Sequence, residues 1–130
     1  MFIVTIRTDK PEAEIGLFED DQKIAYEIWY AHRELSVTLL SKIQELLTTN
    51  GKTLKDIDGI AGFAGPGSFT GLRIGLTVAN TLAYSLQKPV VATGGEDWIA
   101  SAATKLLAGE SDKVAMPEYG APVNITLQKK

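Results

Sequence analysis

The chain has 130 residues and a formal net charge of −3, from 13 basic and 16 acidic side chains, and 45% of its residues are hydrophobic. This length suits one domain, and the composition excludes a wholly disordered chain. The absence of cysteine and the single histidine exclude disulfide scaffolds and both thiolate and multi-histidine metal sites. The N-terminus does not resemble a signal peptide, so we expect a cytoplasmic protein without a membrane segment.

The first part of the chain carries the patterns of a strand meander followed by a helix. β-rich runs predict three strands, at 2–7, 13–19 and 23–30. Leucine and isoleucine then recur at helical spacing from Glu34 to Thr48, and Asn50-Gly51 ends this helix. His32 lies at the junction between strand and helix, where we expect a structural and not a catalytic role.

The rest of the chain alternates strands and helices. We expect a strand at 60–64, a helix at 70–86, a strand at 89–93 and a helix from Glu96 to about Leu107. The order β-β-β-α-β-α-β-α predicts an α/β fold, with a five-stranded mixed sheet and helices on its faces. We expect one domain over 1–107 and a C-terminal tail over 108–130, with a further candidate strand at 123–127.

A glycine-rich loop joins the fourth strand to the second helix. The loop and the helix start contain Gly65, Pro66, Gly67, Ser68, Phe69, Thr70, Gly71 and Arg73. Amides at a helix start attract anions, so one interpretation is a phosphate or carboxylate site. The spacing matches neither the dinucleotide fingerprint nor a P-loop, and Pro66 does not suit a nucleophile elbow around Ser68. We favour the simpler interpretation, a tight turn in which Ser68 or Thr70 caps the helix.

The second helix has few charges and a column of small residues. Arg73 is the only charged residue between Ile60 and Gln87. The small residues lie four positions apart on one face: Gly71, Gly75, Ala79 and Ala83. Such a column allows another helix to approach closely, and this helix is too short and polar to span a bilayer. The first helix of the same chain is one candidate neighbour. Because two glycines inside a helix are costly, we favour a partner protein.

A resemblance to the TsaB (YeaZ) family is carried by GFAGPGSFTGLRIGLTVANTLAYSLQKPVV, from Gly62 to Val91, and extends upstream through HRELSVTLLSKIQELL to the VTIRT start. The family belongs to the bacterial machinery for threonylcarbamoyladenosine in tRNA. The resemblance implies the ribonuclease-H-like half of the actin-like ATPase (ASKHA) fold. It also implies a non-catalytic accessory subunit that binds TsaD, the paralogue that transfers the threonylcarbamoyl group to adenosine 37. TsaE, an ATPase, joins the two.

In the family, the first two helices of this half contact TsaD. Carried over to this chain, the expected partner interface comprises Leu35, Leu39, Ile43, Gly71, Leu72, Gly75, Leu76, Ala79 and Ala83. We expect the isolated chain to form a homodimer through the same helices and to meet tRNA only indirectly. The resemblance implies no catalytic residue, metal ligand or cofactor on this chain, with ATP and metal held by the partner subunits.

Two departures from the family pattern bear on these expectations. The first strand ends Ile6-Arg7-Thr8 where the family commonly has Ile-Asp-Thr, and arginine cannot act as a base or hold a metal. Few residues follow the third helix, which predicts a short form without most of the second domain, although Met116-Pro117-Glu118-Tyr119 loosely resembles the family's C-terminal pattern. The alternative function is a nucleotide- or anion-binding domain that acts at the Gly65–Gly71 loop, and a peptidase is not supported.

Overall fold

The computed structural model describes residues 1–30, 35–112 and 115–116, and there it confirms the predicted order of elements. The elements are β1 (Phe2–Arg7), β2 (Glu12–Glu19), β3 (Gln22–Tyr30), α1 (Leu35–Thr49), η1 (Leu54–Asp56), β4 (Gly59–Gly65), α2 (Phe69–Leu86), β5 (Val90–Gly94) and α3 (Trp98–Leu107). The short 3-10 helix η1 was not predicted. The predictions for His32, Glu34, residues 117–119 and the candidate strand 123–127 concern residues outside the described ranges.

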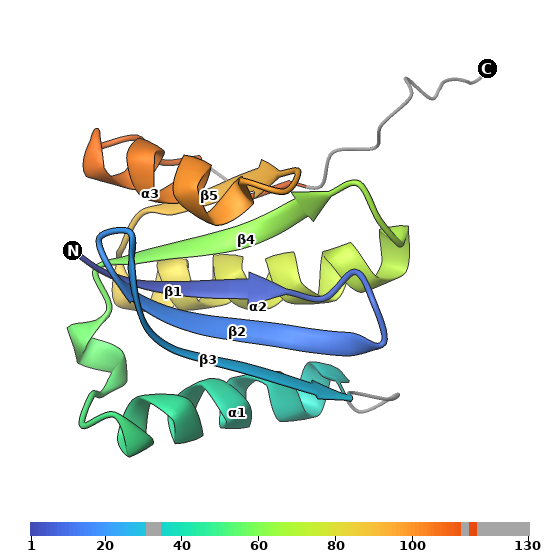
Figure 1. Ribbon diagram of the computed structural model, residues 1–130, viewed down its shortest axis with the longest axis horizontal. Helices are drawn as coiled ribbons and strands as arrows, with labels where there is room; N and C mark the ends of the chain where they lie inside the picture. Colours follow the sequence, from blue (N-terminus) through green and yellow to red (C-terminus); the bar gives the residue numbers. More distant parts are fainter. Residues whose placement is uncertain (31–34, 113–114, 117–130) are drawn as a thin grey trace.

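One mixed sheet forms the centre of the domain, with the strand order β3-β2-β1-β4-β5. The strands β1, β2 and β3 form the expected antiparallel meander, whereas β4 runs parallel to both β1 and β5. Parallel neighbours need crossover connections, which α1 and α2 provide. Figure 1 shows α1 and α2 on one face of the sheet and α3 on the other. In the described ranges, no helix has both the length and the apolar character of a membrane span.

Two apolar clusters hold the helices on the sheet. The alternation of β1 decides which side chain enters which cluster. Val4 and Ile6 point into the cluster under α1 and α2, while Ile3 joins the cluster under α3 with Phe63 and Trp98. Every residue of β4 is buried, as expected for a parallel central strand covered on both faces.

The segment after α3 covers the free edge of β5. Ser111 and Asp112 provide hydrogen-bond partners for the backbone of β5 at distances of 2.7, 2.8 and 3.2 Å. Ala115 then enters the core beside α2, where the Asn80 side chain bonds both of its backbone groups at 2.8 and 3.1 Å. The packing of the domain therefore extends past Leu107, and the edge amides of Val90 and Ala92 are satisfied.

Candidate functional site

Thr8, directly after β1, binds the backbone of α2 with its side chain. Its hydroxyl accepts a hydrogen bond from the Gly75 amide at 3.0 Å and donates one to the Gly71 carbonyl at 2.5 Å. These are the two groups that an uninterrupted α-helix joins to each other. The buried hydroxyl therefore fixes the first turns of α2 to the end of β1.

This contact explains the two glycines of the small-residue column. A Cβ on Gly75 would lie 2.4 Å from the Thr8 hydroxyl oxygen, and a Cβ on Gly71 would lie 2.4 Å from the Thr8 backbone oxygen. Both distances are far below van der Waals contact, so a side chain at either position requires movement. The sequence favoured a partner protein as the close neighbour of this column. At its two glycines the close neighbour is instead the end of β1 in the same chain.

The other residues expected at the partner interface lie in the core. They are Leu35, Leu39, Ile43, Leu72, Leu76, Ala79 and Ala83, and none is more than 6% exposed. Their side chains pack within the two apolar clusters and stabilise the helices on the sheet. A partner that docks on this helix pair therefore contacts the outward-facing neighbours of these residues.

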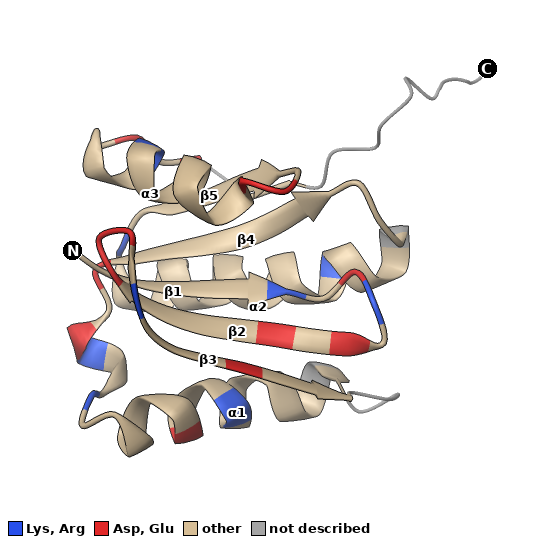
Figure 2. Cartoon of the chain, in the orientation of Figure 1, with Lys and Arg blue, Asp and Glu red and all other residues tan. Residues whose placement is uncertain are grey.

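The outward side of α1 and α2 carries exposed apolar side chains. On α1, Val37 is 72% exposed and Leu40 is 41% exposed, and on α2 the half-buried Ile74 and Val78 lie beside the core cluster. We call these four residues the helix-pair surface. Arg73 is the only charged residue of α2, and Figure 2 shows this helix almost entirely in the colour of uncharged residues. Exposed apolar groups with few charges around them are typical of an interaction surface.

The glycine loop forms a helix cap. Ser68 is the N-cap of α2, and its hydroxyl accepts a hydrogen bond from the Gly71 amide at 3.3 Å, as the simpler interpretation predicted. Gly65 has a φ of 115°, which favours glycine, and a cis peptide bond joins it to the following proline. Gly67 packs on the strand end, because a Cβ there would lie 2.6 Å from the Asp9 Cβ. Pro66 and Thr70 are exposed.

Arg7 forms an ion pair with Asp9 of the same chain. Its Nε and Nη2 donate to the Asp9 carboxylate at 2.8 and 3.2 Å, and its guanidinium lies 3.8 Å above the Phe63 ring. Burial lowers the pKa of Arg7, but the hydrogen bond and charge of Asp9 outweigh this effect, so the pKa is raised.

The residues beside the glycine loop do not fit a bound phosphate. The Asp9 side chain is 6% exposed and lies against Gly67, so it brings negative charge to the place where an anion would sit. Of the cations of this region, Arg7 is already paired with this carboxylate, and Arg73 is exposed on α2. Among the described side chains, no three acidic or histidine groups gather closely enough to hold a metal ion. The anion-binding alternative is therefore not favoured.

Several known proteins are similar to this chain in sequence. A sequence model of the family "TsaD: tRNA N6-adenosine threonylcarbamoyltransferase" matches residues 29–112. The Bacillus subtilis "tRNA threonylcarbamoyladenosine biosynthesis protein TsaB" is 36% identical over 101 residues, which cover 78% of this chain and 44% of that protein. The chain spans about half the length of the curated relatives that it matches.

Solved structures agree with this assignment. "YeaZ from Pseudomonas aeruginosa" superposes with a TM-score of 0.65 at 30% identity, over 72% of this chain and 43% of that chain. The RuvC structure from Thermus thermophilus superposes with a TM-score of 0.55 at 12% identity, over 95% of this chain and 86% of that chain, a likeness that shows the fold alone. The sheet order and these neighbours confirm the ribonuclease-H-like fold of the actin-like ATPases. The chain therefore belongs to the TsaB (YeaZ) family, within the group of sequences that the TsaD model describes.

Proposed function

We propose that this chain is a non-catalytic docking subunit. It binds a TsaD-type partner through the helix-pair surface and thereby supports threonylcarbamoyl transfer to adenosine 37 of tRNA. The names of the relatives support a place in threonylcarbamoyladenosine biosynthesis. The observation that carries the docking role is the exposure of apolar side chains on a helix pair with few charges.

The helix-pair surface has a low cost of desolvation. Fully burying an exposed valine or leucine side chain contributes about 1.5–3 kcal/mol. Val37, which is 72% exposed, keeps most of this area accessible, and Leu40, which is 41% exposed, keeps less than half. The exposed residues of α2 around Ile74 include Thr77 and Thr81, which are polar but uncharged, so water can be removed from these two positions without burying a charge. The free energy gained by burying this apolar area offsets part of the entropy that is lost on association.

The proposed contact is nearly symmetric. This chain matches relatives named as the transferase in addition to relatives named TsaB. A transferase of the same fold would therefore present the same kind of helix pair. Self-complementary surfaces favour twofold pairing. The proposal therefore includes a homodimer of the isolated chain through the same surface, replaced by the heterodimer when the partner is present. On this account tRNA, ATP and metal are held by the partner subunits.

Arginine at Val37 or at Leu40 is expected to weaken TsaD binding by about tenfold or more, because the charge would be buried at the contact. Both side chains are exposed in the monomer, so the free energy of unfolding should change by no more than about 0.5 kcal/mol. Titration calorimetry measures the affinity, and sedimentation velocity measures the loss of the homodimer.

The matched control is Leu107→Arg. Leu107 is 53% exposed at the end of α3, on the opposite face of the sheet, so this variant should bind TsaD as the wild type does. Wild-type affinity in both the Val37 and the Leu40 variants would overturn the docking role. Arginine at Gly75 or Ala79 is a poor test, because these positions are buried and the variant would unfold.

A further inference from the structure

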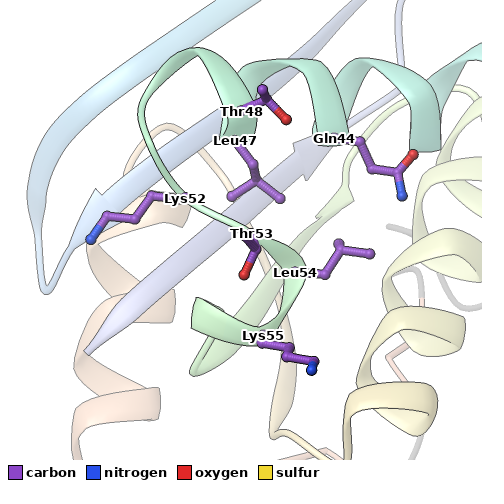
Figure 3. A pocket seen from close by; sticks show the side chains of 7 residues that line it. All are labelled: Gln44, Leu47, Thr48, Lys52, Thr53, Leu54 and Lys55. Atoms are coloured by element: carbon purple, nitrogen blue, oxygen red, sulfur yellow. The ribbon is translucent and has the colours of Figure 1, made fainter.

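A pocket of about 590 Å³ opens between the end of α1 and the loop that carries η1. Figure 3 shows the side chains that line it, which are Gln44, Leu47, Thr48, Lys52, Thr53, Leu54 and Lys55. Pockets of this size accept a small molecule or the anchoring side chains of a protein partner. The polarity and charge of the residues at its floor and margin indicate which of these occupants fits.

The floor of the pocket is apolar. Leu47 comes from the last turns of α1 and belongs to the core cluster, and the half-buried Leu54 packs against the same cluster from η1. Gln44, Thr48 and Thr53 add uncharged polar groups around this floor. An apolar side chain with a polar neighbour therefore fits the pocket better than a purely ionic ligand does.

The margin of the pocket is cationic. In the ranges that the structure describes, no carboxylate lies within ion-pair distance of Lys52 or Lys55, and the Lys52 amine lies 5.2 Å from the Phe2 ring centroid. The carboxylate of the adjacent Asp56 is already engaged, since it accepts hydrogen bonds from the Thr53 amide at 2.8 Å and from the Thr53 hydroxyl at 3.3 Å. Two lysines without a carboxylate partner thus flank an apolar floor.

The pocket continues the helix-pair surface along α1. Leu40, Gln44 and Thr48 are separated by four residues, so they form one row on the outside of the helix. Leu40 belongs to the helix-pair surface, and the other two line the pocket. A partner seated on the helix-pair surface therefore extends over the pocket.

We propose that this pocket receives an apolar side chain from an acidic segment of the docked protein partner, with Lys52 and Lys55 facing the carboxylates of that segment. The inference rests on the docking role proposed above and names where the partner is anchored. A protein suits the site better than RNA does, because an RNA backbone needs an extended basic surface, and this pocket has an apolar floor and two lysines.

The first test fills the pocket. Thr48→Trp places a large side chain at its lining, whereas Thr49→Trp adds the same side chain at the next position, which is also exposed but does not line the pocket. We expect Thr48→Trp to weaken TsaD binding about fivefold or more, and Thr49→Trp to bind as the wild type does. Equal affinities for the two variants would overturn the proposal. Thermal unfolding of each variant shows that it is folded.

The second test reverses the charge. The double variant Lys52→Glu/Lys55→Glu should bind TsaD about tenfold more weakly at low salt, and the difference should shrink at about 0.5 M salt. The control Lys23→Glu/Lys105→Glu has the same net charge, alters exposed or half-exposed lysines away from the pocket, and should bind normally. If the charge-reversed variant does not fold, the milder Lys52→Gln/Lys55→Gln variant replaces it. This variant should lose affinity for TsaD to an intermediate degree.

The outcomes separate this inference from the docking role. Loss of binding in Leu40→Arg together with normal binding in all pocket variants would overturn the anchoring pocket alone. Normal binding in both Val37→Arg and Leu40→Arg as well would overturn the docking role itself. If the lysine variants keep their affinity for TsaD but lose affinity for tRNA in the assembled complex, the occupant is RNA and the proposal is overturned.

Discussion

Gly75→Ala is expected to destabilise the protein by about 2–4 kcal/mol. In an exposed helix the same change has the opposite sign and stabilises by up to about 1 kcal/mol. The difference arises because the new Cβ would lie 2.4 Å from the Thr8 hydroxyl oxygen and 3.2 Å from Ile6 Cγ2, so the strand end and the helix must separate. Urea denaturation measures the free energy of unfolding.

A double variant tests the cause of this loss. Thr8→Ala/Gly75→Ala removes the hydroxyl and the methyl group that the new Cβ meets, and it should recover more than half of the stability lost in Gly75→Ala. Thr77→Ala, at an exposed position of the same helix, should change the stability by about 0.5 kcal/mol at most. A Gly75→Ala variant as stable as the wild type would show that Thr8 does not hold α2 in this way.

Arg7→Met is expected to cost about 2–4 kcal/mol, because it leaves the buried carboxylate of Asp9 without its cation. The Asp9 side chain is 6% exposed, and Arg7 is its hydrogen-bond partner among the described residues. Methionine keeps much of the apolar stem of arginine, but it loses the contact of the guanidinium with the Phe63 ring. Urea denaturation near neutral pH measures the change.

The variant Arg7→Met/Asp9→Asn is the corresponding control. A neutral amide does not need a cation, so the double variant should be more stable than Arg7→Met alone. If Arg7→Met alone were as stable as the wild type, the ion pair would not stabilise this strand end. The interpretation of Arg7 as the charge partner of the strand end would then fail.

Much of the fold could be predicted because its signals are local. The leucine and isoleucine spacing of α1 and the apolar run of β4 placed both elements within one residue of their described bounds. A cap by Ser68 or Thr70 could be expected because both hydroxyl residues lie between the turn and the helix, and the structure assigns the cap to Ser68. The resemblance to the TsaB family added the wider fold, which the sheet order confirmed.

The contacts between distant segments could not be predicted in this way. A column of small residues indicates that something approaches closely, but a strand end and a partner helix require the same small side chains. The hydroxyl of Thr8 reaches Gly75 across 67 positions of sequence, and no local pattern indicates this. The cover that Ser111 and Asp112 provide for β5 was missed for the same reason, since polar residues after a helix usually belong to a loop.

These findings move the expected interface outward on the same helices. The residues that the family resemblance placed at the partner contact hold α1 and α2 on the sheet. Val37 and Leu40 are exposed beside them, and Ile74 and Val78 are half-buried. If the proposed docking role holds, the buried residues position the helices and the outward-facing residues contact the partner. Variants of the buried residues should change stability first, and variants of the outer residues should change binding first.

Hydrogen exchange of this chain, alone and in complex with TsaD, tests the docking role most directly. The account predicts that the amides of α1 and α2 gain protection in the complex, while those of β3 and α3 exchange at unchanged rates. Protection confined to the Gly65–Gly71 loop or to the α3 face, with α1 and α2 unchanged, would contradict it.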